Sequence, residues 1–241
     1  MAKPAGSACN LDCAYCFYLS KRVLPGGPGS GHMPDDVLER FVKDYIDSIT
    51  ADEVVFSWQG GEPTLLGLGF FEKVVALQKK HARAGQRIEN DLQTNGTLLD
   101  DDWARFLKQQ RFLVGLSIDG PREIHDHCRI TKHAEPTFDQ VFAAAKMLQK
   151  HGVRFNTLTC VHRYNASRPL DVYRFLRREI GSTYIQFIPI VEIRGFENMA
   201  PGTWDEAKLP MLGDPRCHPD HPESVVTPWS VAAEEYGYFL S

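Results

Sequence analysis

Three cysteines stand close together near the start of the chain, in the stretch CNLDCAYCFYL. Cys9, Cys13 and Cys16 have the spacing C-x3-C-x2-C, with Tyr15 directly before the last cysteine and Phe17 directly after it. Thiolates bind zinc and iron–sulfur clusters, and both kinds of site ordinarily use four ligands. Three cysteines therefore predict a metal site in which one coordination position is left for a ligand from outside the motif.

Two kinds of metal site fit this spacing. In a [4Fe–4S] cluster, three thiolates leave one iron open to a non-protein ligand, much as a catalytic zinc keeps a position for water. A zinc site would need a distant fourth ligand, and the candidates are Cys128, Cys160 and His32. The aromatic residues on both sides of the last cysteine make the motif specific and favour the iron–sulfur cluster.

Length, composition and charge bound the class of protein. The chain has 241 residues, of which 43% are hydrophobic, and a formal net charge of −4. This is enough for one substantial core, and the charge gives no electrostatic case for nucleic acid or an anionic membrane as partner. There is no bilayer-spanning apolar run and no signal-peptide h-region, and the clustered cysteines favour metal binding in a reducing compartment. We therefore expect a cytoplasmic protein.

Helical and strand patterns alternate along the first 192 residues. Helices are predicted over residues 34–49, 70–85, 100–110, 137–152 and 168–181. Strands are predicted over residues 53–59, 88–94, 112–119, 154–161 and 184–192, and the residues before the cysteines supply one further strand end. Strict alternation of this kind requires parallel strands that are joined by helical crossovers.

A barrel or partial barrel and an open doubly wound sheet both fit this alternation, and the pattern alone does not separate them. In either architecture, function lies in the loops that follow the strands. The chemistry-bearing stretches fall there. The cysteines follow the first strand end, and QGGEP (59–63), QTNGT (93–97) and SIDGP (117–121) follow the next three strands.

The cysteine stretch resembles the cluster motif of the radical S-adenosylmethionine (SAM) superfamily, C-x3-C-x-aromatic-C. GGEP at 60–63 is similar to that superfamily's motif for the SAM amine, although by itself it would be an ordinary strand-to-helix loop. The resemblance implies an α/β fold, a parallel (β/α)6 partial TIM barrel. It also implies a [4Fe–4S] cluster whose open iron is chelated by SAM, and reductive cleavage of SAM to a 5′-deoxyadenosyl radical.

A longer resemblance is to the anaerobic sulfatase-maturating enzymes. It runs over residues 1–192 through MAKPAGSACNLDCAYCFYL, SWQGGEPTLLG, QTNGTLL, SIDGPREIHDHCR, TFDQV and QFIPIVE. Enzymes of that family oxidise a Cys or Ser of a sulfatase to Cα-formylglycine. The resemblance therefore implies a sulfatase polypeptide as substrate and a reducing electron donor such as flavodoxin or ferredoxin. It implies neither nucleic acid nor a membrane as partner.

The resemblance also implies which residues bind the cofactors. The cluster ligands are Cys9, Cys13 and Cys16. The residues implied at SAM or the substrate are Tyr15, Tyr18, Gln59, Gly60, Gly61, Glu62, Ser117, Arg129, Ile190 and Val191. No catalytic base is implied within the chain, because the family's candidate aspartate lies beyond the position of Ser241.

The implied roles at the SAM amine and adenine come first. Gly61 contacts the ligand and Glu62 holds the amine, since glycines let backbone approach closely and an ammonium needs a carboxylate or carbonyls. Tyr15 contacts the adenine. Either Ile190 or Val191 packs beside it, and the register between these two is open.

The remaining implied contacts lie at the SAM ribose and carboxylate or near the substrate. Ser117 and Arg129 are implied at the ribose and carboxylate region, and Gln59 and Tyr18 near the substrate or SAM. Without the resemblance, Ser117 would be a strand hydroxyl that bonds backbone, Arg129 a surface ion-pair residue, and Tyr15 a core residue.

We expect two segments, a radical SAM core over 1–193 and a linker over 194–241 that begins a truncated further region. Periodicity stops after Glu192, and prolines recur from there to Pro228. The family's C-terminal domain, with two auxiliary [4Fe–4S] clusters, has no counterpart here. We therefore expect a fragment that cleaves SAM but completes peptide oxidation poorly.

The remaining cysteines have plainer interpretations. Cys128 and Cys160 are expected to be small buried hydrophobic residues. The stretch CHPDHPE, with Cys217, His218 and His221, is expected to be a proline-rich loop, with a metal site as the less favoured alternative.

Two other functions stay open from the sequence. Another peptide-modifying radical SAM maturase, one that forms thioether or other crosslinks, would share the same core. A non-catalytic iron–sulfur or zinc-binding module would share the cysteines but would have no need of GGEP or of an open coordination position.

Overall fold

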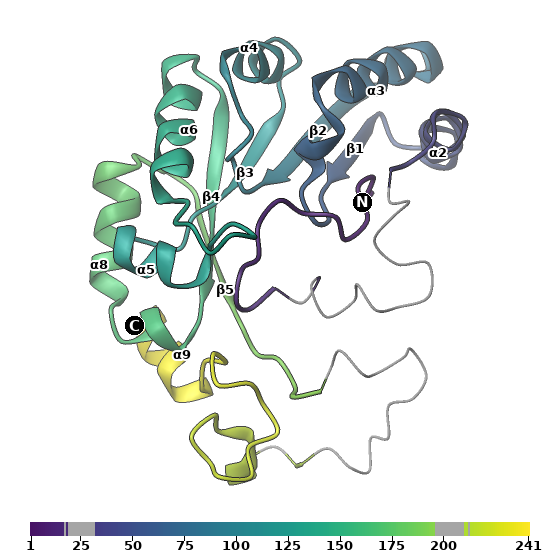
Figure 1. Cartoon of the computed structure of the whole chain (residues 1–241). Helices are drawn as coiled ribbons and strands as arrows, with labels where there is room; N and C mark the ends of the chain where they lie inside the picture. The colour runs from purple at the N-terminus through teal and green to yellow at the C-terminus, as the bar shows by residue number, and fades with distance from the viewer. Residues whose placement is uncertain (17, 19–31, 196–209, 212) are drawn as a thin grey trace. The chain divides into compact units, whose positions relative to one another are not determined.

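The computed structural model describes residues 1–16, 18, 32–195, 210–211 and 213–241 (Figure 1). The chain divides into two compact units. Unit 1 comprises Met1–Asn10, Pro28–Ser117 and Asp139–Asn156. Unit 2 comprises Leu11–Gly27, Ile118–Phe138 and Thr157–Ser241. Phe17, much of the stretch after it, and most of the proline-rich stretch from 196 to 212 lie outside the described residues.

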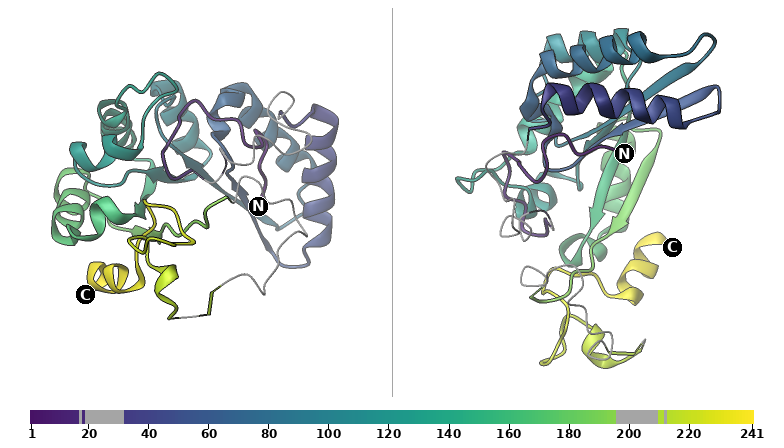
Figure 2. Two further views of the ribbon diagram at one scale, coloured as in Figure 1. Left: turned by 60° about the horizontal axis from the view of Figure 1, so that its bottom comes forward. Right: turned by 90° about the vertical axis from the view of Figure 1, so that its right-hand side faces the viewer.

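Unit 1 is built on a parallel sheet of β1, β2 and β3 with β2 in the middle. These strands are Glu53–Trp58, Arg87–Thr94 and Leu113–Ser117. Its helices are α2 (Asp35–Ser48), α3 (Leu68–His81), α4 (Asp101–Gln109) and nearly all of α6 (Phe138–Lys150), with a 3-10 turn over Pro63–Leu66. Helices α2 and α3 pack side by side (Figure 2).

Unit 2 contains most of β4 (Arg154–Val161), which pairs in parallel with β5 (Ile185–Pro189). Its helices are α5 (Arg122–Cys128), α7 (Arg163–Ala166), α8 (Pro169–Arg174) and α9 (Ala233–Leu240). A π-helical turn over Phe175–Glu179 continues α8, and a short 3-10 turn lies at Pro215–Cys217. Every strand pairing within the two units is parallel, as the alternation of helices and strands requires.

The predicted elements agree with the structure except near their ends. β4 matches its prediction end to end, and α2 matches to within one residue at each end. The helix predicted to reach Gly85 ends at His81, because Ala82 takes extended backbone and a turn follows. The expected strand end before the cysteines is a single parallel bridge between Ala2 and Trp58. Helices α5 and α7 were not predicted, because seven and four residues are too few to show a helical period.

Local signals explain where helix α4 begins. The side chain of Asp100 accepts a hydrogen bond from the backbone N–H of Trp103 at 2.9 Å, which caps the helix. Asp101 and Asp102 occupy the first turn, where the helix dipole favours negative charge. The loop that carries QTNGT, between β2 and α4, therefore ends at the capping residue Asp100.

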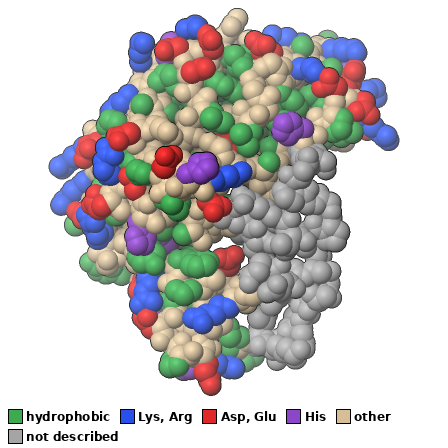
Figure 3. Space-filling model, in the orientation of Figure 1, with side chains coloured by type: hydrophobic (Ala, Val, Ile, Leu, Met, Phe, Trp, Pro, Cys, Tyr) green, Lys and Arg blue, Asp and Glu red, His purple; other side chains and the backbone are tan. Residues whose placement is uncertain are grey.

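The surface carries mixed charge. On the face drawn in Figure 3, acidic and basic side chains lie among one another. Among the described residues, every helix is too short or too polar to cross a bilayer.

Aromatic rings fill the core of unit 1. β1 alternates, so that Val54, Phe56 and Trp58 are buried while the residues between them are less so. The ring of Phe71, on α3, is fully buried and lies 6.0 Å from the ring of Trp58 and 5.4 Å from that of Trp103, edge to face in both cases. Such contacts add to the free energy of burying the rings themselves. Phe71 is thus the link between the sheet and the neighbouring helices.

Replacement of Phe71 by alanine should lower the free energy of unfolding by about 3–5 kcal/mol, because it removes a fully buried ring and leaves a cavity. Urea unfolding followed by circular dichroism measures the loss. Val37→Ala on α2, where the side chain is 46% exposed, is the control and should change stability by less than about 0.5 kcal/mol. Similar losses in the two variants would contradict this description of the core.

Candidate active site

The carboxylate of Glu62 is the centre of the polar site in unit 1. Glu62 is 1% exposed, in the loop that follows β1. Its Oε1 accepts hydrogen bonds from the N–H and hydroxyl of Thr64, at 3.0 and 2.7 Å, and from the hydroxyl of Thr94 at 2.8 Å. Its Oε2 accepts one from the N–H of Asn95 at 2.7 Å. One side chain thereby ties the loop after β1 to the loop after β2.

This carboxylate keeps some capacity for a further donor. Burial raises the pKa of Glu62, and the hydrogen bonds from Asn95, Thr64 and Thr94 oppose that shift. A carboxylate oxygen can accept about two hydrogen bonds, and among the described residues Oε2 accepts one, from the N–H of Asn95. One acceptor position on Oε2 is therefore compatible with an ammonium donor. The role of Glu62 toward the SAM amine stays a prediction.

The glycines of GGEP are needed for contacts within the chain itself. The N–H of Gly61 donates to the carbonyl of Gly6 at 2.9 Å, and the N–H of Glu62 donates to the carbonyl of Ala8 at 2.8 Å. A Cβ at Gly61 would overlap the backbone carbonyl of Ala8, and Gly60 has a φ of +130°. The loop after β1 thus lies against the segment that leads into Cys9, and only glycine permits that approach.

Asn95 connects the same loop to the first cysteine. Its Nδ2 donates to Asn10 Oδ1 at 2.9 Å and lies 3.9 Å from the sulfur of Cys9. Asn10 in turn donates to the hydroxyl of Thr97 at 2.8 Å. Donors that point at a sulfur favour the thiolate form and tune a bound iron–sulfur cluster. The QTNGT loop therefore holds the surroundings of Cys9 as well as Glu62.

The carboxylate of Asp119 is the centre of the polar site in unit 2. It is fully buried just after β3, and it accepts the hydroxyl of Tyr15 at Oδ2. Arg129 donates from Nε to Oδ2 at 2.9 Å and from Nη2 to Oδ1 at 3.2 Å. The N–H of Cys160 donates to Oδ1 at 3.0 Å. Arg129, which is 7% exposed, is thus one half of a buried ion pair rather than a surface residue.

The charges of this site are fixed by their neighbours. Burial by itself would raise the pKa of Asp119, but the charge and hydrogen bonds of Arg129, together with the nearby His162 and His125, outweigh burial and lower the pKa from its ordinary value. Burial raises the pKa of Tyr15 well above its ordinary value. At neutral pH, Asp119 is therefore a carboxylate, and Tyr15 is a protonated donor to it.

His162 completes the site and was not predicted from the sequence. It is fully buried directly after β4, and its ring stacks on that of Tyr15 with centroids 5.4 Å apart. Burial lowers the pKa of His162, so the ring is neutral. Neither ring nitrogen has a hydrogen-bond partner among the described residues. Asp119 lies within SIDGP, but no role was predicted for it. Asp119 and His162 both directly follow a predicted strand, and this position could have marked them as candidate site residues.

Cys13 and Cys16 belong to the loop of residues 11–16 in unit 2, whereas Cys9 belongs to unit 1. The loop is held by backbone hydrogen bonds from Asp12 to Ile130 at 2.8 Å and from Ala14 to Cys128 at 2.9 Å. None of the six cysteines, all of them described, forms a disulfide. The three thiol groups are therefore available as ligands, and the ligand set of Cys9, Cys13 and Cys16 stays a prediction.

The other cysteines differ in burial. Cys128 is fully buried as expected, and burial raises its pKa to about 12. Cys160 was also expected to be buried but is half-buried, and burial of its thiol group likewise raises its pKa to about 12. Pro215–Cys217 form a 3-10 turn and further turns follow, so the stretch with Cys217, His218 and His221 is a loop as predicted. The metal alternative for this stretch stays a prediction.

The remaining predicted ligand contacts are partly accessible. Tyr18, Gln59, Ser117 and Ile190 are half-buried, and Ser117 ends β3. Val191 is 62% exposed. Exposure therefore favours Ile190 over Val191 as the residue that packs beside a bound ring, although that role stays a prediction.

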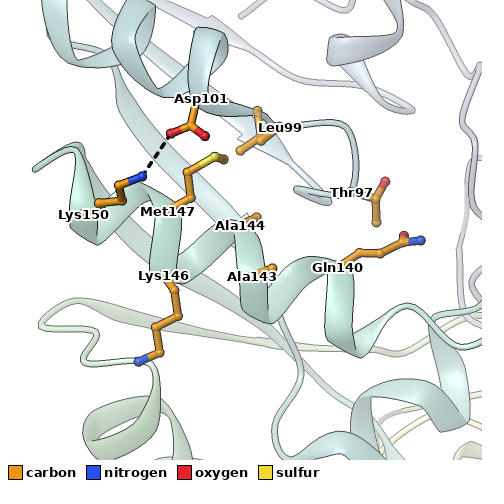
Figure 4. A pocket seen from close by; sticks show the side chains of 9 residues that line it. All are labelled: Thr97, Leu99, Asp101, Gln140, Ala143, Ala144, Lys146, Met147 and Lys150. Carbon is orange, nitrogen blue, oxygen red and sulfur yellow. Dashed lines mark ion pairs between the residues drawn. The ribbon is translucent and has the colours of Figure 1, made fainter.

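A separate hollow in unit 1 lies between the start of α4 and helix α6 (Figure 4). Ala144, Met147 and Leu99 form its apolar part, and an ion pair between Asp101 and Lys150, 3.5 Å long, lies at its edge. Of the predicted site residues, none lines this hollow. It is therefore not assigned to the active site.

Comparison with known proteins decides the family. Residues 4–176 match the radical SAM superfamily, and this is well over half of the chain. The chain belongs to the radical SAM superfamily. A [4Fe–4S] cluster and SAM are the cofactors of that superfamily.

Close relatives of this radical SAM protein are sulfatase-maturating enzymes. It is 42% identical over 240 residues to the serine-type anaerobic sulfatase-maturating enzyme of Bacteroides thetaiotaomicron, covering 100% of this chain and 55% of the relative. It is 44% identical over 214 residues to the cysteine-type enzyme of Clostridium perfringens, covering 87% of this chain and 57% of the relative. The chain thus spans about half the length of the curated relatives it matches.

A solved structure gives the same result for the fold. Native anSMEcpe with bound AdoMet and the Cp18Cys peptide matches with a TM-score of 0.77 at 37% identity, over 99% of this chain and 56% of that chain. The expected class, an α/β partial barrel of the radical SAM type, is confirmed. Five strands are present as elements, and the bridge at Ala2 stands in the place of the sixth.

The residues present fit the cofactors of the superfamily. The three motif cysteines are free of disulfides, so they offer the thiolates that a cluster needs. Unit 1 offers the spare acceptor position on Glu62 beside neutral donors. Unit 2 offers the two ring nitrogens of His162, which make no hydrogen bond to the described residues although Nε2 lies 4.0 Å from Asp119 Oδ2. Buried polar atoms of this kind ordinarily find a partner, and a polar ligand can supply one.

The close contact between GGEP and the segment before Cys9 predicts that an alanine substitution lowers stability at Gly61 but not at Gly69. Gly61→Ala should lower the free energy of unfolding by about 1–3 kcal/mol, because the new methyl group overlaps the Ala8 carbonyl. Gly69→Ala, on α3 with open space around its Cα, should be neutral or stabilising by up to about 1 kcal/mol. Urea unfolding compares them, and a neutral Gly61→Ala would refute the contact.

Glu62→Gln should destabilise the protein by about 1–3 kcal/mol near pH 7, because an amide NH2 cannot accept from the N–H of Asn95 or Thr64. A carboxyl whose pKa is raised on folding loses stabilising effect as pH rises through that raised value. The advantage of the wild type over Glu62→Gln should therefore be greatest near and below pH 4.5 and shrink above it. Unfolding titrations across this range test the sign, and an advantage that grows with pH would contradict it.

Proposed function

We propose that this chain is the radical SAM core of an anaerobic sulfatase-maturating enzyme, which oxidises a Cys or Ser of a sulfatase polypeptide to Cα-formylglycine. The observation that carries the proposal is 42% identity to a serine-type enzyme along the full length of this chain. The cysteine-type relative matches at 44%, so the proposal covers both substrate residues.

The proposal assigns the cofactors to the residues that the family resemblance implies. Cys9, Cys13 and Cys16 bind a [4Fe–4S] cluster, and the backbone of Gly60 and Gly61 lies with Glu62 at the SAM amine. The adenine and ribose side is assigned to Tyr15, Ser117, Arg129 and Ile190, and Gln59 and Tyr18 lie near the substrate or SAM. The loaded cofactors supply a 5′-deoxyadenosyl radical, which abstracts a hydrogen atom from the substrate.

The chain's own contribution is to bind and orient. In its ionised form the carboxyl group of Glu62 is a buried negative charge that faces neutral donors, and such a charge attracts a cation. The stacked, buried rings of His162 and Tyr15 exclude water from one side of the loop of residues 11–16. Water exclusion protects a reactive intermediate from side reactions.

Segments, partners and compartment follow from the same proposal. Residues 1–193 form the radical SAM core, and residues 194–241 lead from it. The electron donor is a low-potential protein such as flavodoxin or ferredoxin. The enzyme works in the cytoplasm, where thiolate ligands stay reduced.

Anaerobic reconstitution tests the proposal. With iron and sulfide, the wild type should bind about four irons per chain. With dithionite, SAM and a short Cys peptide that carries a sulfatase sequence, it should yield 5′-deoxyadenosine, and mass spectrometry should detect formylglycine in the peptide. Cys13→Ala should lose the iron, whereas Cys217→Ala, at an exposed cysteine, should keep it.

Three outcomes would count against the proposal. Stoichiometric zinc in place of iron would indicate a zinc-binding module. A loaded cluster that never cleaves SAM would indicate a non-catalytic iron–sulfur protein. A thioether or other crosslink in place of formylglycine would indicate another peptide maturase.

A further inference from the structure

We propose that Asn95 is a positioning residue for the first cysteine of the cluster motif. Its side-chain amide holds Cys9 in orientation and, by donating toward the sulfur, raises the reduction potential of the bound cluster. The inference rests on the proposed function only in taking Cys9 as a cluster ligand. No residue of the QTNGT loop was predicted to serve a cofactor, so this role is a new one for the loop.

Three side chains form a closed ring of hydrogen bonds beside Cys9. Asn95 Nδ2 donates to Asn10 Oδ1 at 2.9 Å, Asn10 Nδ2 donates to Thr97 Oγ1 at 2.8 Å, and Thr97 Oγ1 donates to Asn95 Oδ1 at 2.7 Å. Each member is both donor and acceptor, so the three groups polarise one another and favour one arrangement. The ring joins the residue after Cys9 to the loop after β2, 85 residues further along the chain.

A backbone donor fixes the direction of this ring. The oxygen and nitrogen of an asparagine side chain are distinguished by their hydrogen-bond partners. The N–H of Thr97 can only donate, and it donates to Asn95 Oδ1 at 3.0 Å. Oδ1 is therefore the carbonyl oxygen, and the NH2 group faces Asn10 and Cys9.

The NH2 group of Asn95 has two hydrogens, so it can donate to the sulfur of Cys9 as well as to Asn10. Nδ2 lies 3.9 Å from Cys9 Sγ, at the length of a long hydrogen bond to sulfur. In its thiol form, Sγ itself donates to Asn10 Oδ1, also at 3.9 Å. A metal-bound thiolate has no proton to donate and becomes an acceptor, for which Asn95 offers an N–H. Hydrogen bonds to the sulfurs of a cluster favour its reduced, more negative state.

The backbone of Asn95 is anchored independently of its side chain. Its N–H donates to Glu62 Oε2 at 2.7 Å, and the N–H of the next residue, Gly96, donates to Thr94 Oγ1 at 3.0 Å. Asn95 is 7% exposed. With the backbone held at Glu62 and the carboxamide oxygen held by Thr97, the donor has little freedom to turn away from Cys9.

Asn95→Asp tests the donor directly. It keeps the shape and the acceptor for Thr97 but replaces the NH2 group by an oxygen that faces Asn10 Oδ1 and Cys9 Sγ. The reconstituted variant should lose iron to a chelator about tenfold faster than the wild type, because repulsion replaces a hydrogen bond to a charged group. At a fixed potential, its ratio of reduced to oxidised cluster should fall about tenfold, which is about 59 mV for a one-electron couple.

An anaerobic redox titration followed by electron paramagnetic resonance measures this ratio. Thr97→Val, which removes a single hydroxyl from the ring, should move the potential in the same direction by a smaller amount. Unchanged potential and iron retention in Asn95→Asp would overturn the inference, and an unchanged potential in Thr97→Val would overturn the part that the ring plays in it.

Asn90→Asp is the matched control, because Asn90 is a buried asparagine on β2 of the same unit with an analogous set of partners. Its Oδ1 accepts from Trp58 Nε1 at 2.9 Å, and its Nδ2 donates to Gln78 Oε1 at 2.9 Å, so the substitution removes the same kind of donor. It should lower the stability of the fold but leave the potential of the cluster unchanged. A shift as large as that of Asn95→Asp would show a general effect of instability, and the inference would fail.

The metal-free chain gives a readout that does not depend on the proposed function. NMR with 15N-labelled asparagine should show a nuclear Overhauser contact between the side-chain amide protons of Asn95 and the Hβ protons of Cys9. In Thr97→Val, these amide protons should exchange with water about tenfold faster. A folded wild type without the contact would overturn the inference. A wild type that shows the contact but never binds iron would refute the proposed function and the redox role with it, while the orientation of Cys9 by Asn95 would stand.

Discussion

The carboxylate of Asp119 is a negative charge held away from water, and the rest of unit 2 is arranged around that constraint. A buried charge is stable only when it is paired and fully hydrogen-bonded. Arg129 supplies the pairing, and Tyr15 and the backbone of Cys160 supply the remaining donors. The cysteine loop, the end of β4 and the segment after α5 therefore meet at one side chain.

Glu62 in unit 1 is buried to the same degree, but among the described residues its donors are all neutral. The pKa values of the two carboxyl groups therefore shift in opposite directions. Burial raises the pKa of Glu62, whereas Arg129 and the nearby histidines together outweigh burial and lower the pKa of Asp119. Their spare capacities differ as well. Asp119 is saturated by the protein, and Glu62 keeps an acceptor position on Oε2. A carboxylate that has no cationic partner among the described residues is suited to a cationic ligand.

Both polar sites stand at the carboxyl ends of parallel strands. The loops after β1 and β2 join at Glu62, and the residue Asp119 after β3 is joined to Cys160 near the end of β4. Each site also reaches the cysteine motif, through Asn95 beside Cys9 in one unit and through Tyr15 in the other. The motif residues are thus held by protein contacts that do not themselves depend on a cofactor.

The sequence by itself determined the family, the cysteine motif and most of the elements. Burial imposes a helical or alternating period on local sequence, so α2 and β4 could be located within a residue. Short elements such as α5 were not predicted, because seven residues are too few to establish a helical period.

Only the tertiary structure decided how the buried polar groups are paired. Tyr15 and Asp119 are 104 residues apart in the chain, and Cys160 and Asp119 are 41 apart, so no local pattern connects them. The same holds for Gly61, whose missing side chain is required by the carbonyl of Ala8. The motif of Arg129 predicts a role toward SAM, but it does not reveal the carboxylate of Asp119, which folding brings within 2.9 Å of Arg129. Hydrophobic periodicity in the sequence indicates which residues are buried. Hydrogen-bond partners, in contrast, depend on distances that only the folded chain defines.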